Sequence, residues 1–179
     1  MATTESFANG GAPLVRSAGA GSERAADGSR GPYREYTIYK PLRSGKGGVL
    51  RFELNPQTPA VFVTVARQVA GEQRRFDWEN KVVMKWGLSD IGEILAALER
   101  RQDEAKLYHS TDKANTAFEL KHQGERTPPN YFASMSRQKA DTREVERLGV
   151  AVSLGEASVL SALLRYAALV LSSWSIPVG

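Results

Sequence analysis

The sequence predicts an α+β fold made of a duplicated unit of four strands followed by one helix. Two observations support this prediction. Four short stretches rich in β-branched and aromatic residues precede a stretch with helical periodicity, and this order occurs twice. Fragments of the first half also return, in the same order, in the second half. We therefore expect two four-stranded antiparallel sheets and two helices packed between them.

In the first half the strands are expected at Tyr33–Lys40, Val49–Leu54, Ala60–Val69 and Lys81–Trp86. Turn signals separate them, above all Pro41 with the glycine-rich loop 45–48, and the pair Asn55-Pro56. The period then changes to that of a helix, which we expect from about Ser89 to Arg101. Four apolar residues lie at i, i+3, i+4 and i+7 of this helix: Ile91, Ile94, Leu95 and Leu98.

The second half repeats these elements, and short stretches of its sequence match the first half. Phe52-Glu53-Leu54 returns as Phe118-Glu119-Leu120, and the stretch 62–68 returns as 132–138 after an insertion near 124–129. Ser153 and Glu156 form an S-x-x-E capping box, which predicts a second helix from about Leu154 to Trp174. The two repeats are therefore expected to cover residues 33–101 and 105–174 of a single domain, 33–179.

The third strand of each half has two different faces. The first face carries apolar residues that should pack under a helix: Val61, Val63 and Val65, matched by Tyr131, Ala133 and Met135. The other face begins with an aromatic residue, Phe62 or Phe132, and continues with small polar groups such as Thr64 and Ser134, while Arg67 and Arg137 lie near the strand ends. Such a face suits base stacking and phosphate contact. A solvated sheet face with one half-buried Phe explains the same residues, and the pattern alone leaves both interpretations open.

Apolar residues surround the second helix almost completely, which indicates that it is buried on more than one side. Either a partner subunit or both sheets of the same chain could cover it. For the two tryptophans near the first helix we expect different places. Trp86 should be a core anchor, whereas Trp78, close to Arg74, Arg75 and Lys81, suits a core position and a base-contacting surface about equally.

Composition limits the classes of function. The chain has 179 residues, 41% hydrophobic and 25% charged, a net charge of +4 and no cysteine, so it suits one packed domain and excludes disulfides and thiol chemistry. The mild positive charge favours an anionic partner. Residues 1–32 are mostly Gly, Ala, Ser and Thr, which predicts a flexible N-terminal tail. Arg165 interrupts the longest apolar run, so we expect no membrane span.

No catalytic or cofactor pattern is present in the sequence. The two histidines, His109 and His122, lie 13 residues apart without metal-ligand spacing, and the glycine-rich loop lacks the first glycine of a phosphate-binding P-loop. Asp77 and Glu79 stand among basic residues, as in an ordinary ion-pair cluster. We therefore expect a protein that is not an enzyme, with no metal and no cofactor.

Four segments, 39–50, 73–81, 86–92 and 107–109, resemble the Whirly family of single-stranded-DNA-binding proteins. Tyr39-Lys40 followed by Gly45–Leu50 resembles the family's Lys-Gly-Lys-Ala-Ala-Leu signature, with Arg43 and Ser44 inserted and Gly47-Gly48 in place of the two alanines. The segment 73–81 (QRRFDWENK) is similar to the family's Glu-Arg-Lys-Tyr-Asp-Trp-Glu-Lys block, and 86–92 to its Leu-Ser-x-x-Glu-Val-Gly helix start. Leu107-Tyr108-His109 stands where the family has Phe-Phe-His.

This resemblance implies two sheets splayed like blades, with helices that join them and form the core of a homotetramer. It also implies binding of single-stranded DNA with little sequence specificity. Basic residues would contact phosphates, and aromatic residues would stack on bases. The expected phosphate contacts are Lys40, Lys46, Arg67, Arg74, Arg75 and Arg137. The expected stacking residues are Tyr39, Phe62, Trp78, Tyr108 and Phe132.

Two alternatives remain open. Kinetoplastid guide-RNA-binding proteins share the Whirly fold, so the nucleic acid could be RNA, and a protein-interaction module could use the same sheets. The residues do not distinguish repair, replication, transcription or storage. We expect a cytoplasmic, nucleoid-associated protein in a bacterium, or an organellar or nuclear one in a eukaryote.

Overall fold

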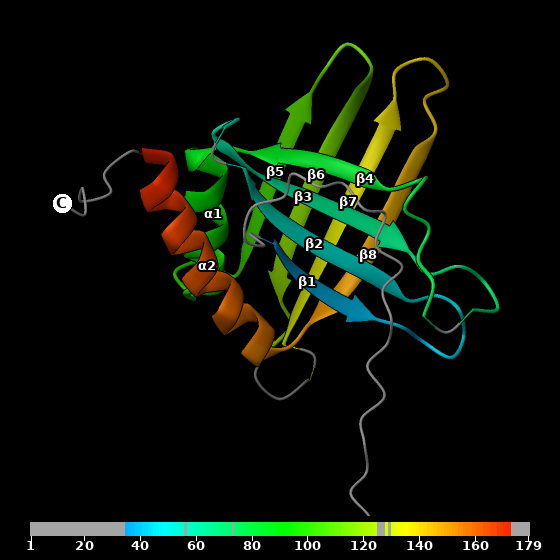
Figure 1. Ribbon diagram of the computed structural model, residues 1–179, viewed down its shortest axis with the longest axis horizontal. Coiled ribbons are helices and arrows are strands. Elements are labelled where there is room, and N and C mark those ends of the chain that lie inside the picture. Colours follow the sequence, from blue (N-terminus) through cyan, green and yellow to red (C-terminus); the bar gives the residue numbers. More distant parts are fainter. Residues whose placement is uncertain (1–34, 56, 73, 125–127, 129, 173–179) are drawn as a thin grey trace, which may run out of the picture. The chain divides into compact units, whose positions relative to one another are not determined.

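A computed structural model describes residues 35–55, 57–72, 74–124, 128 and 130–172 (Figure 1). The described strands form two four-stranded antiparallel sheets, each in chain order. Sheet one contains β1 (Glu35–Lys40), β2 (Gly48–Asn55), β3 (Ala60–Arg67) and β4 (Val82–Trp86). Sheet two contains β5 (Glu104–Ser110), β6 (Ala114–His122), β7 (Tyr131–Lys139) and β8 (Val145–Val152). One helix follows each sheet, so the predicted fold class is confirmed. The expected tail, 1–32, lies outside the described residues.

Two elements end earlier than the sequence predicts. β3 stops at Arg67 rather than Val69, because Gln68 leaves the ladder and forms an isolated bridge with Phe76. Helix α1 (Leu88–Leu98) stops three residues before Arg101. Arg100 has a φ of 60°, in the left-handed region, and such a residue ends a helix. The last apolar residue of the helical pattern, Leu98, is also the last residue of α1.

One hydrophobic core joins both sheets and both helices. The apolar residues predicted to lie under a helix are all buried, from Val61, Val63 and Val65 in β3 to Tyr131, Ala133 and Met135 in β7. Trp86 is fully buried, with ring centroids 5.7 Å from Phe52 and 4.9 Å from Phe118. The expectation that Trp86 anchors the core is therefore confirmed, and this residue links the two sheets through aromatic contacts.

Helix α2 (Leu154–Ser172) packs beside α1, and both lie at the same end of the sheets (Figure 1). The predicted capping box is present: the backbone N–H of Ser153 donates to Glu156 Oε2 at 2.8 Å, and the N–H of Glu156 donates to Ser153 Oγ at 3.3 Å. The buried face of α2 is narrow and consists of Ala157, Leu160, Leu164 and Ala167.

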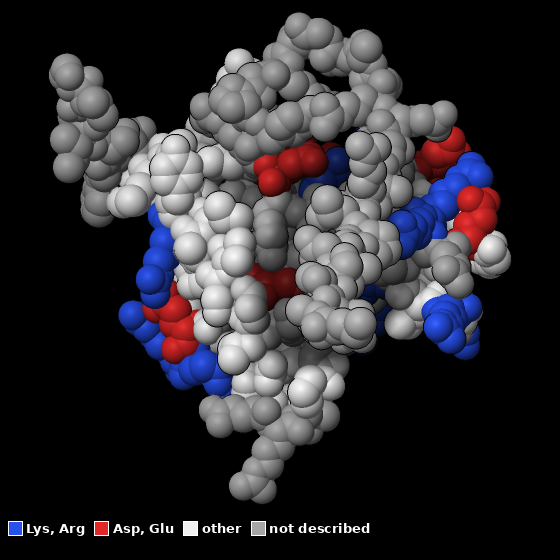
Figure 2. Space-filling view, turned by 60° about the horizontal axis from the view of Figure 1, so that its bottom comes forward, with Lys and Arg blue, Asp and Glu red and all other residues white. Residues whose placement is uncertain are grey.

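The opposite side of α2 is apolar, and the described part of the chain leaves it exposed. Its exposed residues include Val159, Leu163, Tyr166 and Leu169. Figure 2 shows this helical side as an area free of charge, with charged side chains at its border. By length and composition α2 is the one helix in the described part of the chain that could cross a membrane, a test that core helices also pass. Among the described residues, none covers this exposed face.

The strand registers refine the correspondence between the two halves. Phe62 pairs with Glu53 in sheet one, whereas Phe132 pairs with Lys121 in sheet two. If Phe62 is aligned with Phe132, Phe52 on β2 corresponds to Leu120 on β6. The match of Phe52 with Phe118, which the sequence suggested, is therefore two residues out of register. A shift of two residues preserves the face of a strand, so both phenylalanines still point into the core.

Candidate nucleic-acid interface

Each sheet has an outer face that points away from the shared core, and the same aromatic residues recur on both. Tyr39 pairs with Val49 in sheet one, and Tyr108 pairs with Ala117 at the corresponding place in sheet two. Phe62 and Phe132 occupy matching positions on the third strands. Tyr39 is 56% exposed, Tyr108 65% and Phe132 39%, while Phe62 is half-buried. Four of the five expected stacking residues therefore form two equivalent pairs.

The tip of the Phe132 ring lies over Gly149 in the neighbouring strand β8. A Cβ atom at residue 149 would overlap with this ring. Beside it, Ser134 is buried and receives a hydrogen bond from Arg147, which also binds Glu119 at 3.0 Å. The outer face of sheet two thus offers one aromatic platform at Phe132 on β7, a second at Tyr108 on β5, and a cation, Arg147, on the edge strand β8 next to β7.

The outer face of sheet one is partly covered by its own β3–β4 connection. Phe76 from this connection packs on Val49 and Ala66, and its ring centroid lies 5.6 Å from that of Tyr39. Trp78 is half-buried, with the guanidinium carbon of Arg51 4.3 Å from its ring centroid, a cation–π contact. The face was expected to be a strip of small polar groups, but Thr64 and Ala66 are buried because the connection folds over them.

Gln68 belongs to the architecture of the loop rather than to an exposed polar face. It is 4% exposed, and its Oε1 accepts hydrogen bonds from the N–H groups of Leu42 at 2.8 Å and Gly47 at 3.0 Å. Its Nε2 donates to the carbonyl of Glu72 at 2.9 Å. Gln68 therefore ties the lysine loop 41–47 to the β3–β4 connection. A Cβ at residue 47 would collide with Gln68 Oε1 and the Lys40 carbonyl, which explains the glycine at this position.

The six expected phosphate contacts do not form a single patch. Lys40 Nζ is bound to Glu156 Oε1 at 2.7 Å, at the start of α2. Lys46 is exposed and lines a groove with Arg67 and Arg147. Arg74 lies beside the lysine loop with Arg43, and Arg75 pairs with Glu72 at 3.0 Å while 70% of its side chain stays exposed. The structure brings Lys46 and Arg67 together, and places Lys40 in a structural ion pair.

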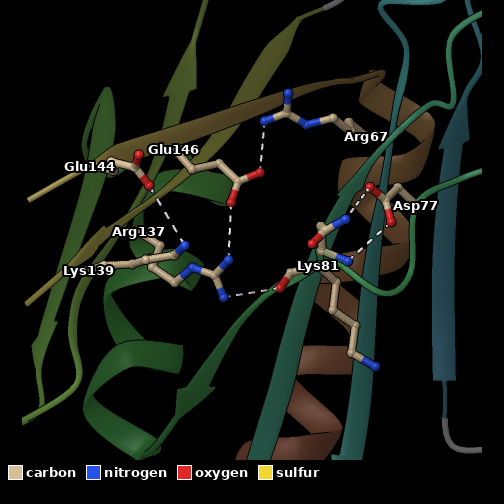
Figure 3. A network of polar contacts seen from close by, with 8 residues as sticks. Arg67, Asp77, Lys81, Arg137, Lys139, Glu144 and Glu146 are labelled. Atoms are coloured by element: carbon tan, nitrogen blue, oxygen red, sulfur yellow. Dashed lines mark hydrogen bonds and ion pairs between the residues drawn. The ribbon is translucent and has the colours of Figure 1, made fainter. Parts of the chain in front are cut away.

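Arg67 and Arg137 meet in a cleft of about 720 Å³ between the two sheets (Figure 3). Both point to the core side of their strands, opposite Phe62 and Phe132. Arg67 Nη2 donates to Glu146 Oε1 at 2.8 Å, and Arg137 Nη2 donates to Glu146 Oε2 at 3.1 Å. Arg137 also donates to the Lys81 carbonyl at 3.5 Å. These contacts join β7 and β8 of sheet two to sheet one.

Sequence reasoning missed two cations, Arg51 and Arg147. Both lie on the outer faces, where Arg51 pairs with Thr64 and Arg147 with Ser136. The signal that could have found them is cross-strand pairing. Arg51 lies on β2, next to β3, and Arg147 lies on β8, next to β7. The alternation of side chains along each strand places both arginines on the outer face.

The other polar residues singled out in the sequence have structural roles. Asp77 accepts hydrogen bonds from the backbone and side chain of Asn80, and these bonds lower the pKa of its carboxyl. His109 lies 3.1 Å from Asp90, and His122 Nδ1 accepts from the N–H of Gly124 at 3.0 Å. Among the described residues, no group of three His, Asp or Glu side chains gathers closely enough to hold a metal ion.

Comparison with known proteins identifies the family. The model of the Whirly transcription factor family matches residues 48–163, nearly two thirds of the chain. The chain belongs to the Whirly family. The resemblance seen in the lysine loop and in the segment 73–81 is thereby confirmed at family level, although the loop residues before 48 lie outside the match. Among curated protein sequences, no relative matches this chain.

Solved structures with the same fold include two plant Whirly proteins. The plant transcriptional regulator PBF-2 has 19% identity and a TM-score of 0.62, over 82% of this chain and 86% of that one. WHY1 from Arabidopsis thaliana has 17% identity and a TM-score of 0.63, over 82% and 89%. The MRP1/MRP2 proteins of Trypanosoma brucei have 16% identity and a TM-score of 0.57, over 80% and 88%. At these identities the likeness shows the fold.

Proposed function

We propose that this Whirly protein binds single-stranded nucleic acid, DNA in preference to RNA, with little sequence specificity. The observation that carries the proposal is the repeated aromatic pair on the outer faces, Tyr39 with Phe62 and Tyr108 with Phe132. Exposed aromatic rings on a sheet stack on unpaired bases, and every base offers a π-face, so the contact tolerates any sequence. Bases in a duplex are already stacked and cannot use these platforms.

Cations close to the aromatic residues support the same proposal. Arg147 lies beside Phe132, and the exposed Lys46 lines a groove that reaches the same strand, β8. Arg74 lies beside the lysine loop, which begins two residues after Tyr39. A strand of nucleic acid on these faces would meet positive charge along its phosphates and rings along its bases, as in other single-strand binders.

The test is a comparison of three probes under identical salt: single-stranded DNA, duplex DNA and single-stranded RNA of one length. We expect the tightest binding to single-stranded DNA, with affinity that falls steeply as salt rises, because phosphate contacts release counterions. Equal affinity for the duplex would contradict the stacking mechanism. Affinity independent of salt would favour the protein-interaction module.

RNA is the second candidate, and one comparison favours it. A guide-RNA-binding protein complex, solved bound to a guide RNA, shares the fold with 17% identity and a TM-score of 0.51. The outer faces of the two sheets would accept unpaired RNA bases by the same stacking. A stronger affinity for single-stranded RNA in the three-probe comparison would select this alternative.

We also propose that the protein is a homotetramer whose core is built by the helices. The support is the uncovered apolar side of α2, including Val159, Leu163 and Tyr166. In aqueous solution, an apolar helical face of this kind marks a site where another apolar surface packs. Helix α1 and the core occupy the other side of α2, so a second copy of the chain is the simplest cover.

A further inference from the structure

Two arginines from different sheets converge on one carboxylate in the cleft between the sheets. Arg67 ends β3, Arg137 lies near the end of β7, and Glu146 lies near the start of β8. Each guanidinium donates to a different oxygen of Glu146, at 2.8 and 3.1 Å (Figure 3). The Glu146 side chain is 23% exposed, so the site opens to solvent through the cleft.

This arrangement is the one that guanidinium groups adopt around a phosphate. A phosphate presents several anionic oxygens and is commonly held by two or more cationic donors, each on its own oxygen. Glu146 supplies two such oxygens at the meeting point of two cations. Glu146 therefore presents its two oxygens to the arginines as a phosphate does.

Each cation that lines the cleft has a carboxylate partner. The four cations are Arg67, Arg137, Lys139 and Arg147. Glu146 holds the first two, Glu144 lies 3.8 Å from Lys139, and Glu119 lies 3.0 Å from Arg147. An incoming anion must replace one of these partners, and only Glu146 occupies two cations at once.

We infer that the cleft between the sheets is a phosphate-binding site for single-stranded nucleic acid, where the phosphate displaces the Glu146 carboxylate from Arg67 and Arg137. The inference rests on the proposed function. Glu146 then acts as a built-in competitor that lowers affinity for nucleic acid. Because it comes from the same chain, it is always present, and it returns to the arginines when the strand leaves.

The experiment removes the competing charge. Glu146→Gln keeps the size of the side chain and should tighten binding of a fluorescent oligothymidylate by about two- to thirtyfold, since two partly exposed ion pairs no longer oppose the phosphate. The matched control is Glu99→Gln. Glu99 is also shared by two arginines, Arg101 at 3.0 Å and Arg165 at 2.9 Å, but it lies on the helical side. It should change the affinity by less than about twofold, because screening weakens distant charges.

A double-mutant cycle locates the effect. With Arg67→Ala and Arg137→Ala already in place, Glu146→Gln should add no more than the control does, because its gain acts through those two side chains. A gain that persists without the arginines would overturn the inference. So would an equal gain from Glu146→Gln and Glu99→Gln, which would reflect net charge alone.

A second variant covers the case in which Glu146→Gln does not fold. Glu146→Asp keeps the charge but is one methylene shorter and cannot reach both arginines. It should tighten binding too, by less than Gln; unchanged or weaker binding by a folded Glu146→Asp protein would count against the site. If the unaltered protein does not bind oligothymidylate at all, the proposed function fails. If the unaltered protein binds but Glu146→Gln and Glu146→Asp behave like Glu99→Gln, only the inference fails.

Discussion

The tip of the Phe132 ring lies over Gly149, and no side chain would fit between them. This contact gives a way to move a stacking platform without removing it. Gly149→Ala should push the ring aside at small cost in stability, about 0.5 kcal/mol, because the ring is at the free end of its side chain and 39% exposed. Single-stranded DNA binding should nevertheless weaken by about 1–3 kcal/mol, as for Phe132→Ala.

The control for this substitution is Gly92→Ala in α1, where an added Cβ meets nothing within 4 Å. It should leave DNA binding unchanged. Unaltered binding by Gly149→Ala would mean that the Phe132 ring is not a base-contacting surface.

Tyr108 tests stacking where packing hardly contributes. Its side chain is 65% exposed, so Tyr108→Ala should leave the thermal midpoint within a degree or two, a shift below about 0.5 kcal/mol. Binding should weaken by about 1–3 kcal/mol per stacked base, with the dependence of log affinity on log salt unchanged. Tyr108→Phe should keep most of the affinity. A flatter salt dependence for Tyr108→Ala would indicate that the residue binds a phosphate instead.

The arginine pair should show the opposite signature. Arg67→Ala together with Arg137→Ala should weaken single-stranded DNA binding and flatten the slope of log affinity against log salt by roughly 0.7 for each phosphate that the protein no longer binds. Both side chains also join the sheets through Glu146, so the thermal midpoint should fall modestly. Melting curves and binding at several salt concentrations are measured on the same protein. An unchanged slope would assign both residues to structure alone.

Most of the fold could be predicted because its strands and helices are signalled by residues that are close together in the sequence. Alternation in β3, the change to helical period at Ile91 and the box at Ser153 each depend on a few neighbouring residues, and tertiary packing agrees with them. The predicted ends at Val69 and Arg101 were wrong, because the observed ends at Arg67 and Leu98 depend on a bridge to Phe76 and on the conformation of Arg100. Neither is encoded in hydrophobic period.

The candidate site was less predictable, since it depends on partners distant in sequence. Nothing near Lys40 indicates that Glu156, 116 residues away, neutralises it. Likewise Gln68 looks like the end of a polar face, but the loop it holds could be seen only once Leu42 and Gly47 were placed around it. Charge and aromatic type identify candidates, whereas pairing decides which of them are free for a ligand.

The apolar side of α2 makes assembly sensitive to one charge. Leu163 is 43% exposed in this chain, so Leu163→Glu should fold as a subunit but dissociate the proposed tetramer, because burial of an unpaired carboxylate at the interface is costly. Light scattering at micromolar concentration should give the tetramer mass for the unaltered protein and for Leu163→Met. A monomer mass for the unaltered protein would refute the assembly proposal.

Glu156 should make stability depend on pH in a defined direction. Burial acts to raise the pKa of its carboxyl, but hydrogen bonds from Lys40 and Ser153 outweigh burial, so the pKa in the folded protein is lowered from its ordinary value of 4.5. A group whose pKa is lower in the folded than in the unfolded state binds protons more readily when unfolded. Its contribution to stability is therefore complete above about pH 4.5 and is lost as the pH falls through the folded value.

Glu156→Gln isolates this contribution, because glutamine still caps the helix but carries no charge. The variant should be less stable than the unaltered protein near neutral pH, by about 0.3–1 kcal/mol, the range for a negative charge at a helix N-terminus, because the cap itself is kept. The difference should shrink as the pH drops below about 4.5. Urea unfolding of both proteins across this range measures it. Lys40→Met should remove part of the same pH dependence, since Lys40 Nζ lies 2.7 Å from the carboxylate. If the difference in stability between the two proteins stays constant as the pH falls below 4.5, the Lys40–Glu156 ion pair does not stabilise the fold. Lys40 could then exchange Glu156 for a phosphate, as the sequence predicted.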